Sequence, residues 1–77
     1  MVNRVYQIVS DVMGIPIEMI NDEASPDSIS SWDSMAHLNL ILAIETEFNI
    51  SLSPEEGLEM MSVKLIRLTL QGHGIDS

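Results

Sequence analysis

Apolar residues near the start of the chain recur at intervals of three and four positions. This spacing is typical of an amphipathic helix that buries one face, and it predicts a helix over about residues 3–13. Gly14 and Pro16 end this helix, because glycine accommodates a left-handed terminal turn and proline cannot continue the helix. A polar segment follows as far as Trp32, and a long loop is predicted there. The apolar residues of the first helix are Val2, Val5, Ile8, Val9 and Val12.

A second helix is predicted from Asp33–Ser34 to Phe48, with Asn49 as its stop, and its apolar residues lie on two faces. At about 100° per residue, one group falls within a single arc of roughly 100°, the width of a core-facing stripe. Its members are His37, Leu40, Ile41, Ile44 and Phe48. A second group lies on a different face, directly below Ser34, and consists of Met35, Leu38 and Leu42.

We expect this second group to be at least partly exposed, because a bundle of few helices cannot bury both faces of one helix. Asp33 stands at the head of the group and Glu45 continues its line, so carboxylates border the apolar side chains. An apolar patch with a polar rim marks a protein-binding surface. The alternative is that the long loop folds over this face and covers it.

The sequence Ser-Pro-Glu-Glu at residues 53–56 predicts the start of a short helix, because serine can cap, proline suits the first helical position and Glu56 completes a capping box. Ser62 then caps a last helix over about residues 63–71, which Gly72 ends. The predicted fold is all-α, a small bundle of three longer helices plus one short helix, with a long loop between helices one and two. We expect one domain over residues 1–77, with a core at about 2–71 and a frayed tail at 72–77.

Charge and composition limit the partners of this chain. Twelve acidic residues against three basic ones give a net charge of −9, which repels nucleic acid and anionic membranes and attracts basic protein surfaces. Alternatively, the acidity only keeps the protein soluble.

The chain contains no cysteine, so disulfides and thiolate metal sites are excluded. No segment approaches the roughly 20 apolar residues of a membrane span, and Met1 resembles a native start, so a soluble, cytoplasmic, stand-alone protein is expected. We also expect a monomer.

Catalysis and metal binding are not expected. Ser34 with His37 as its base would lack an oxyanion hole, and the Gly-x-Ser-x-Gly elbow of a nucleophilic serine is absent. His37 lies on the core-facing arc, where a hydrogen-bonded structural histidine is the commoner role. Asp33 and His37 could reach a metal ion only with His73, which falls in the expected tail. At this stage Asp33 and Ser34 are both candidate N-caps.

The run from Trp32 to Phe48, WDSMAHLNLILAIETEF, resembles the second helix of acyl carrier proteins, with their Asp-Ser-Leu signature and a hydrophobic helix ending in Glu-x-Glu-Phe. The resemblance extends over nearly the whole chain. It implies that a holo-acyl-carrier-protein synthase (a phosphopantetheinyl transferase) attaches phosphopantetheine from coenzyme A to Ser34. The thiol of this arm would carry acyl groups as thioesters to acyl-loading, acyl-transfer or condensing enzymes with basic docking surfaces. The expected docking residues are Asp33, Met35, Leu38, Leu42, Glu45, Glu55 and Glu56.

Several residues depart from the family pattern. Met35 replaces the usual leucine, and Trp32, where many carriers have a small residue, either anchors the loop against the second helix or touches a partner or the arm. His37 and Asn39 make this helix less acidic than in carriers of bulk fatty acid synthesis, which favours a polyketide, modified-lipid or surface-glycan pathway. The Asp-Ser-Met form is also similar to D-alanine carriers. An unmodified acidic helical adaptor, with Ser34 as a cap, is the remaining alternative.

Overall fold

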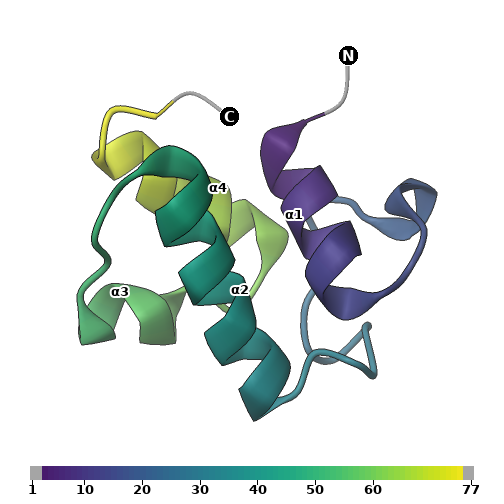
Figure 1. Ribbon diagram of the computed structural model, residues 1–77. Coiled ribbons are helices and arrows are strands. Elements are labelled where there is room, and N and C mark those ends of the chain that lie inside the picture. The colour runs from purple at the N-terminus through teal and green to yellow at the C-terminus, as the bar shows by residue number, and fades with distance from the viewer. Residues whose placement is uncertain (1–2, 76–77) are drawn as a thin grey trace.

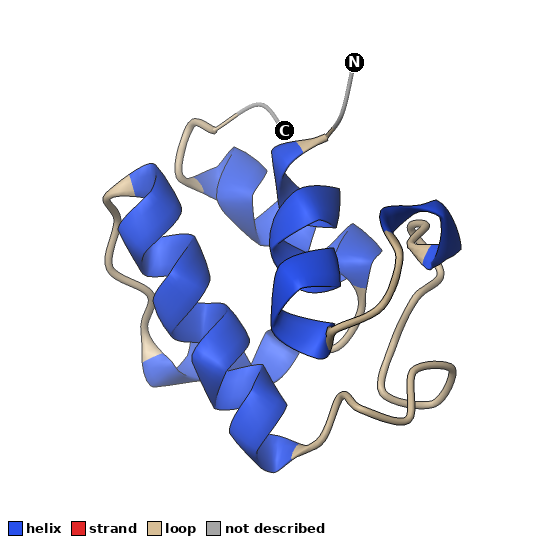
Figure 2. Ribbon diagram, turned by 45° about the vertical axis from the view of Figure 1, so that its right-hand side comes forward, coloured by secondary structure: helices blue, strands red, loops and turns tan. Residues whose placement is uncertain are grey.

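The computed structural model describes residues 3–75, which contain four α-helices and one short 3₁₀ helix joined by loops (Figure 1). Residues 1–2 and 76–77, which the sequence predictions included, lie outside the described residues. Within residues 3–75 there is no strand, and the predicted all-α class is confirmed (Figure 2). The elements are α1 Arg4–Met13, η1 Ile17–Met19, α2 Ser34–Phe48, α3 Pro54–Glu59 and α4 Val63–Gly72.

Helix α1 begins and ends as its sequence predicts. The Asn3 side chain accepts the backbone N–H groups of Val5 and Tyr6, and Gly14 takes the left-handed conformation at φ 70° with its N–H bonded to Ser10 O. The buried face of α1 packs on α2 and on α4. This face forms the core together with Leu40 and Ile44 of α2 and the buried side chains of α4. The core also includes Met60 and four residues of the long loop, Ile20, Ala24, Ile29 and Trp32. The core residues of α1 are Val5, Ile8, Val9 and Met13.

The long loop between α1 and α2 is tied to the bundle, and it contains the 3₁₀ turn η1, which the sequence did not predict (Figure 2). The N–H of Val63 donates to Ala24 O at 3.0 Å, and the N–H of Lys64 donates to Asp22 O at 3.1 Å, so the loop runs along the start of α4. The side chain of Asp22 accepts both Arg67 at 2.8 and 2.9 Å and the Tyr6 hydroxyl at 2.9 Å.

Helices α3 and α4 both begin at serine caps. Ser53 and Glu56 form the predicted capping box, and the Ser62 hydroxyl accepts the N–H of Leu65. Residues 72–75, which the sequence predictions placed in a frayed tail, make contacts with the bundle. His73 Nε2 lies 2.6 Å from a carboxylate oxygen of Glu56, and Ile75 packs against the core with its N–H bonded to Leu70 O.

Candidate functional site

Ser34 is the first residue of α2, where the helix meets the long loop. It is exposed, and within residues 3–75 no hydrogen bond engages its hydroxyl. Asp33, rather than Ser34, is the N-cap: its carboxylate accepts the N–H of Ala36 at 2.8 Å. Asp33 O accepts the N–H of His37 at 2.8 Å, which starts the helical hydrogen-bond ladder. The hydroxyl of Ser34 is therefore exposed to solvent and is not used to cap the helix. The N–H groups of Ser34 and Met35 have no acceptor within the helix.

The apolar side chains below Ser34 are exposed, as predicted, and the loop does not cover them. Met35 is 68% exposed, Leu38 53% and Leu42 54%, and we call these three residues the α2 face. The core arc of the same helix behaves differently, because Leu40 and Ile44 are fully buried. One helix therefore contributes one face to the core and leaves another in contact with water. Such exposed leucine and methionine side chains are favourable material for a protein interface.

A groove of about 300 Å³ runs between α2 and α3 beside the α2 face. Leu38 and Leu42 line it from α2, and Leu58, which is 76% exposed, lines it from α3. Leu58 was not predicted from the sequence, because a helix of six residues is too short to show a periodic face. The only available signal was an apolar residue between acids in an otherwise polar helix.

A chain of hydrogen bonds joins the start of α2 to α3. The indole Nε1 of Trp32 donates to Nδ1 of His37 at 3.0 Å, and Nε2 of His37 lies 2.8 Å from Gly57 O. Because an indole N–H only donates and a carbonyl only accepts, these partners require the neutral histidine with its hydrogen on Nε2. Trp32 is 3% exposed, so it anchors the loop and is not available to a partner. His37 has the structural role that its place on the core arc predicts.

Gly57 allows the close approach of α3 to α2. A Cβ atom at this position would lie 3.0 Å from Cδ1 of Ile41, so any larger residue would have to displace that side chain. Gly57 is buried in α3, and its carbonyl oxygen accepts the hydrogen bond from Nε2 of His37. His37, Ile41 and Gly57 all line the groove between the two helices.

The predicted acidic docking residues differ in how free they are. Glu55 is exposed at the start of α3. Glu45 accepts the N–H of Leu52 at 2.8 Å, and so helps to fix the turn after α2. In Glu56, the backbone N–H of Ser53 and then the His73 side chain lower the pKa of the carboxyl, which keeps it ionised. Glu45 and Glu56 thus have structural partners within the chain, whereas Glu55 has its charge in solvent.

Two further findings concern metal binding and membrane insertion. The described residues contain no group of three histidine or acidic side chains that could hold a metal ion. Among residues 3–75, none of the helices is both long and apolar enough to traverse a lipid bilayer.

An exposed serine at the tip of one helix, beside an uncovered apolar face in a small acidic helical bundle, fits a carrier domain. Comparison with known proteins agrees. The family model described as a phosphopantetheine attachment site matches residues 3–66, which include Ser34. The chain is also 34% identical over 61 residues to the acyl carrier protein of Buchnera aphidicola subsp. Schizaphis graminum (strain Sg), covering 79% of this chain and 77% of that protein. The chain belongs to the acyl carrier protein family, whose cofactor is phosphopantetheine.

Proposed function

We propose that Ser34 is the attachment residue of the phosphopantetheine arm and that the chain carries acyl groups on it. The observation that carries this proposal is the exposed, unbonded Ser34 hydroxyl at the first position of α2, inside the matched region. In the transfer reaction, Ser34 Oγ forms a phosphodiester with the phosphopantetheine of coenzyme A. The adenosine bisphosphate of coenzyme A leaves, and the hydroxyl proton passes to a base of the transferase.

The start of α2 fits a phosphodiester. The N–H groups of Ser34 and Met35 have no helical acceptor, and the positive end of the helix dipole favours an anion there. Asp33 already accepts the N–H of Ala36, so its carboxylate is held in the cap. When bound, the arm supplies a thiol that holds the acyl group as a thioester. The protein itself supplies the attachment point and the surface that partner enzymes bind.

Partner enzymes dock, in this proposal, on the α2 face with help from acidic side chains at its rim. The rim comprises Asp33, Glu45, Glu55 and Glu56, and a transferase or acyl-processing enzyme with a basic surface complements it. Between Asp33 and Glu45 the helix has no charged residue. The centre of the surface is therefore recognised through shape and apolar contact, which supports a dedicated pathway such as polyketide, modified-lipid or surface-glycan synthesis. We also infer that residues 1–77 form a single carrier domain.

The test of attachment is an intact-mass measurement. The protein is incubated with coenzyme A and a broad-specificity phosphopantetheinyl transferase, in parallel with Ser34→Ala. We expect the wild-type chain to gain the mass of one phosphopantetheine and Ser34→Ala to gain nothing. An unshifted wild-type protein with several such transferases would support the unmodified adaptor instead. Trapping the native cargo on the arm then identifies the pathway, and an aminoacyl cargo would replace the acyl assignment.

A further inference from the structure

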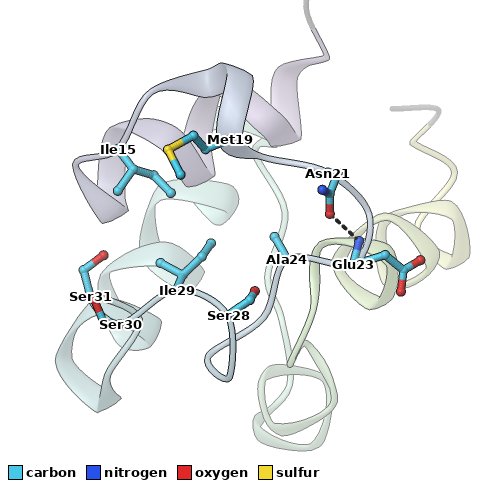
Figure 3. A pocket seen from close by; sticks show the side chains of 9 residues that line it. All are labelled: Ile15, Met19, Asn21, Glu23, Ala24, Ser28, Ile29, Ser30 and Ser31. Carbon is cyan, nitrogen blue, oxygen red and sulfur yellow. Dashed lines mark hydrogen bonds between the residues drawn. The ribbon is translucent and has the colours of Figure 1, made fainter.

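A second hollow lies in the loop between α1 and α2 and shares no lining residue with the groove between α2 and α3. It has a volume of about 350 Å³ (Figure 3). Ile15, Met19 and Ile29 give it apolar walls, and in Figure 3 the first two side chains extend toward the third. Ser30 and Ser31 are part of its polar rim. This mixture of apolar wall and polar rim distinguishes it from the groove between α2 and α3, whose lining is mainly leucine, isoleucine and proline.

The polar rim offers hydrogen-bond acceptors. The Ser31 hydroxyl donates its hydrogen to Met13 O at 2.9 Å. The Ser28 hydroxyl donates to Ser25 O at 3.2 Å and already accepts the N–H of Ser25 at 3.1 Å, so only one of its lone pairs is left. A hydroxyl that donates its single hydrogen still has lone pairs that can accept. Ser30 is exposed, and its hydroxyl can rotate to donate or to accept. A ligand for this pocket therefore combines N–H donors with a compact apolar body.

The pocket is close to Ser34 along the chain. Ser31 lines it and is three peptide links from Ser34, so their Cα atoms are at most about 11 Å apart. The N–H of Asp33 donates to Ser31 O at 3.0 Å, which folds this connection back on itself. A group attached to Ser34 is thus confined near the pocket mouth, where its effective concentration is high and weak contacts are enough to hold it.

We propose that this loop pocket holds the pantetheine part of the arm on Ser34 when no partner enzyme is bound. The inference rests on the proposed function. Pantetheine has two amide N–H donors, which suit the serine oxygens, and a geminal dimethyl group, which suits the wall formed by Ile15, Met19 and Ile29. The α2 face then stays open to partners while the arm rests on the loop side of the same helix start.

The experiment uses the loaded protein with a spin label on the thiol of the arm. Because the chain contains no cysteine, that thiol is the only one present. Methionine and leucine methyl groups serve as NMR reporters: Met19 at the pocket, Leu42 and Leu58 at the groove between α2 and α3, and Met61 after α3. We expect the label to reduce the Met19 signal several-fold relative to Met61. Equal Met19 and Met61 intensities, or selective loss of Leu42 and Leu58 methyl signals, would overturn the inference.

A pair of serine substitutions separates pocket binding from simple proximity. Ser30→Phe fills the rim of the pocket, and Ser51→Phe places the same ring at an exposed serine between α2 and α3. We expect Ser30→Phe to restore the Met19 signal to the level of Met61, and Ser51→Phe to leave the loss unchanged. A Met19 loss that survives Ser30→Phe contradicts the proposal. Loading is verified by intact mass beforehand: without a mass gain the proposed function fails and this inference falls with it, whereas a loaded arm that avoids the pocket refutes the inference alone.

Discussion

Leu38 offers the sharpest test of the α2 face as a docking surface. Its side chain is 53% exposed in the free protein, so about half of its apolar surface is available to a partner. Full burial of a leucine side chain is worth roughly 2 kcal/mol, and covering the exposed half is therefore worth about 1 kcal/mol. Leu38→Ala should weaken the complex by about this amount, which corresponds to a roughly fivefold higher Kd.

The assay is calorimetric titration of the unmodified protein with a phosphopantetheinyl transferase. Leu68→Ala is the matched control, because Leu68 is 49% exposed and lies on α4. The two substitutions remove the same atoms from sites of nearly equal exposure, so they should lower Tm by similar amounts. Only Leu38→Ala should raise Kd. If Leu38→Ala binds as the wild type does, or if Leu68→Ala weakens binding equally, the α2 face is not the docking surface.

Three further predictions concern stability and charge. His37→Ala leaves the Trp32 indole N–H and the carbonyl that His37 reached without partners, and in urea denaturation it should lower the free energy of unfolding by about 2 kcal/mol more than Asn39→Ala. Arg67 lowers the pKa of Asp22 below 3.8, so this pair stabilises the fold fully above that pH and progressively less as pH falls through the lowered value. Asp22→Asn should lower the free energy of unfolding by only about 1 kcal/mol at pH 7, because the side chains of Arg67 and Asp22 are 31% and 39% exposed and solvent screens the pair. It should also make the free energy of unfolding fall less steeply at acid pH. Glu55→Lys should slow stopped-flow association with a basic transferase, less so at high salt.

Each of these three has a definite contrary result. Equal destabilisation by His37→Ala and Asn39→Ala would mean that the bonds to the imidazole contribute little. An acid limb of stability that is as steep in Asp22→Asn as in the wild type would remove the role of the ion pair. A Glu55→Lys rate that matches the wild type at low salt would show that this charge does not guide partners.

Local patterns predicted the helices and the exposed face well. The boundaries of α2 follow from Asp33 and Asn49, whose cap conformations depend on neighbouring residues alone. The division of α2 into a buried and an exposed face follows from helical geometry, and burial of Leu40 with exposure of Leu38 confirms it.

Features set by residues far apart in the chain could not be predicted. The bond from His37 to Gly57 O joins residues 20 positions apart, and no local signal pairs them. The contact of His73 with Glu56 joins residues 17 positions apart, and no local signal pairs them either. The loop pocket is lined by residues between Ile15 and Ser31, and backbone hydrogen bonds from Val63 and Lys64 to Ala24 and Asp22 tie part of that segment to α4.

The central claim is that one hydroxyl, that of Ser34, carries the arm. The chain has ten serines, and Ser30 and Ser31 are also exposed nearby, so the most direct measurement locates the modification by fragmenting the loaded peptide in a mass spectrometer. We predict that every fragment containing Ser34, and none lacking it, has the added phosphopantetheine. Added mass on Ser30 or Ser31, or on no serine at all, would contradict the account.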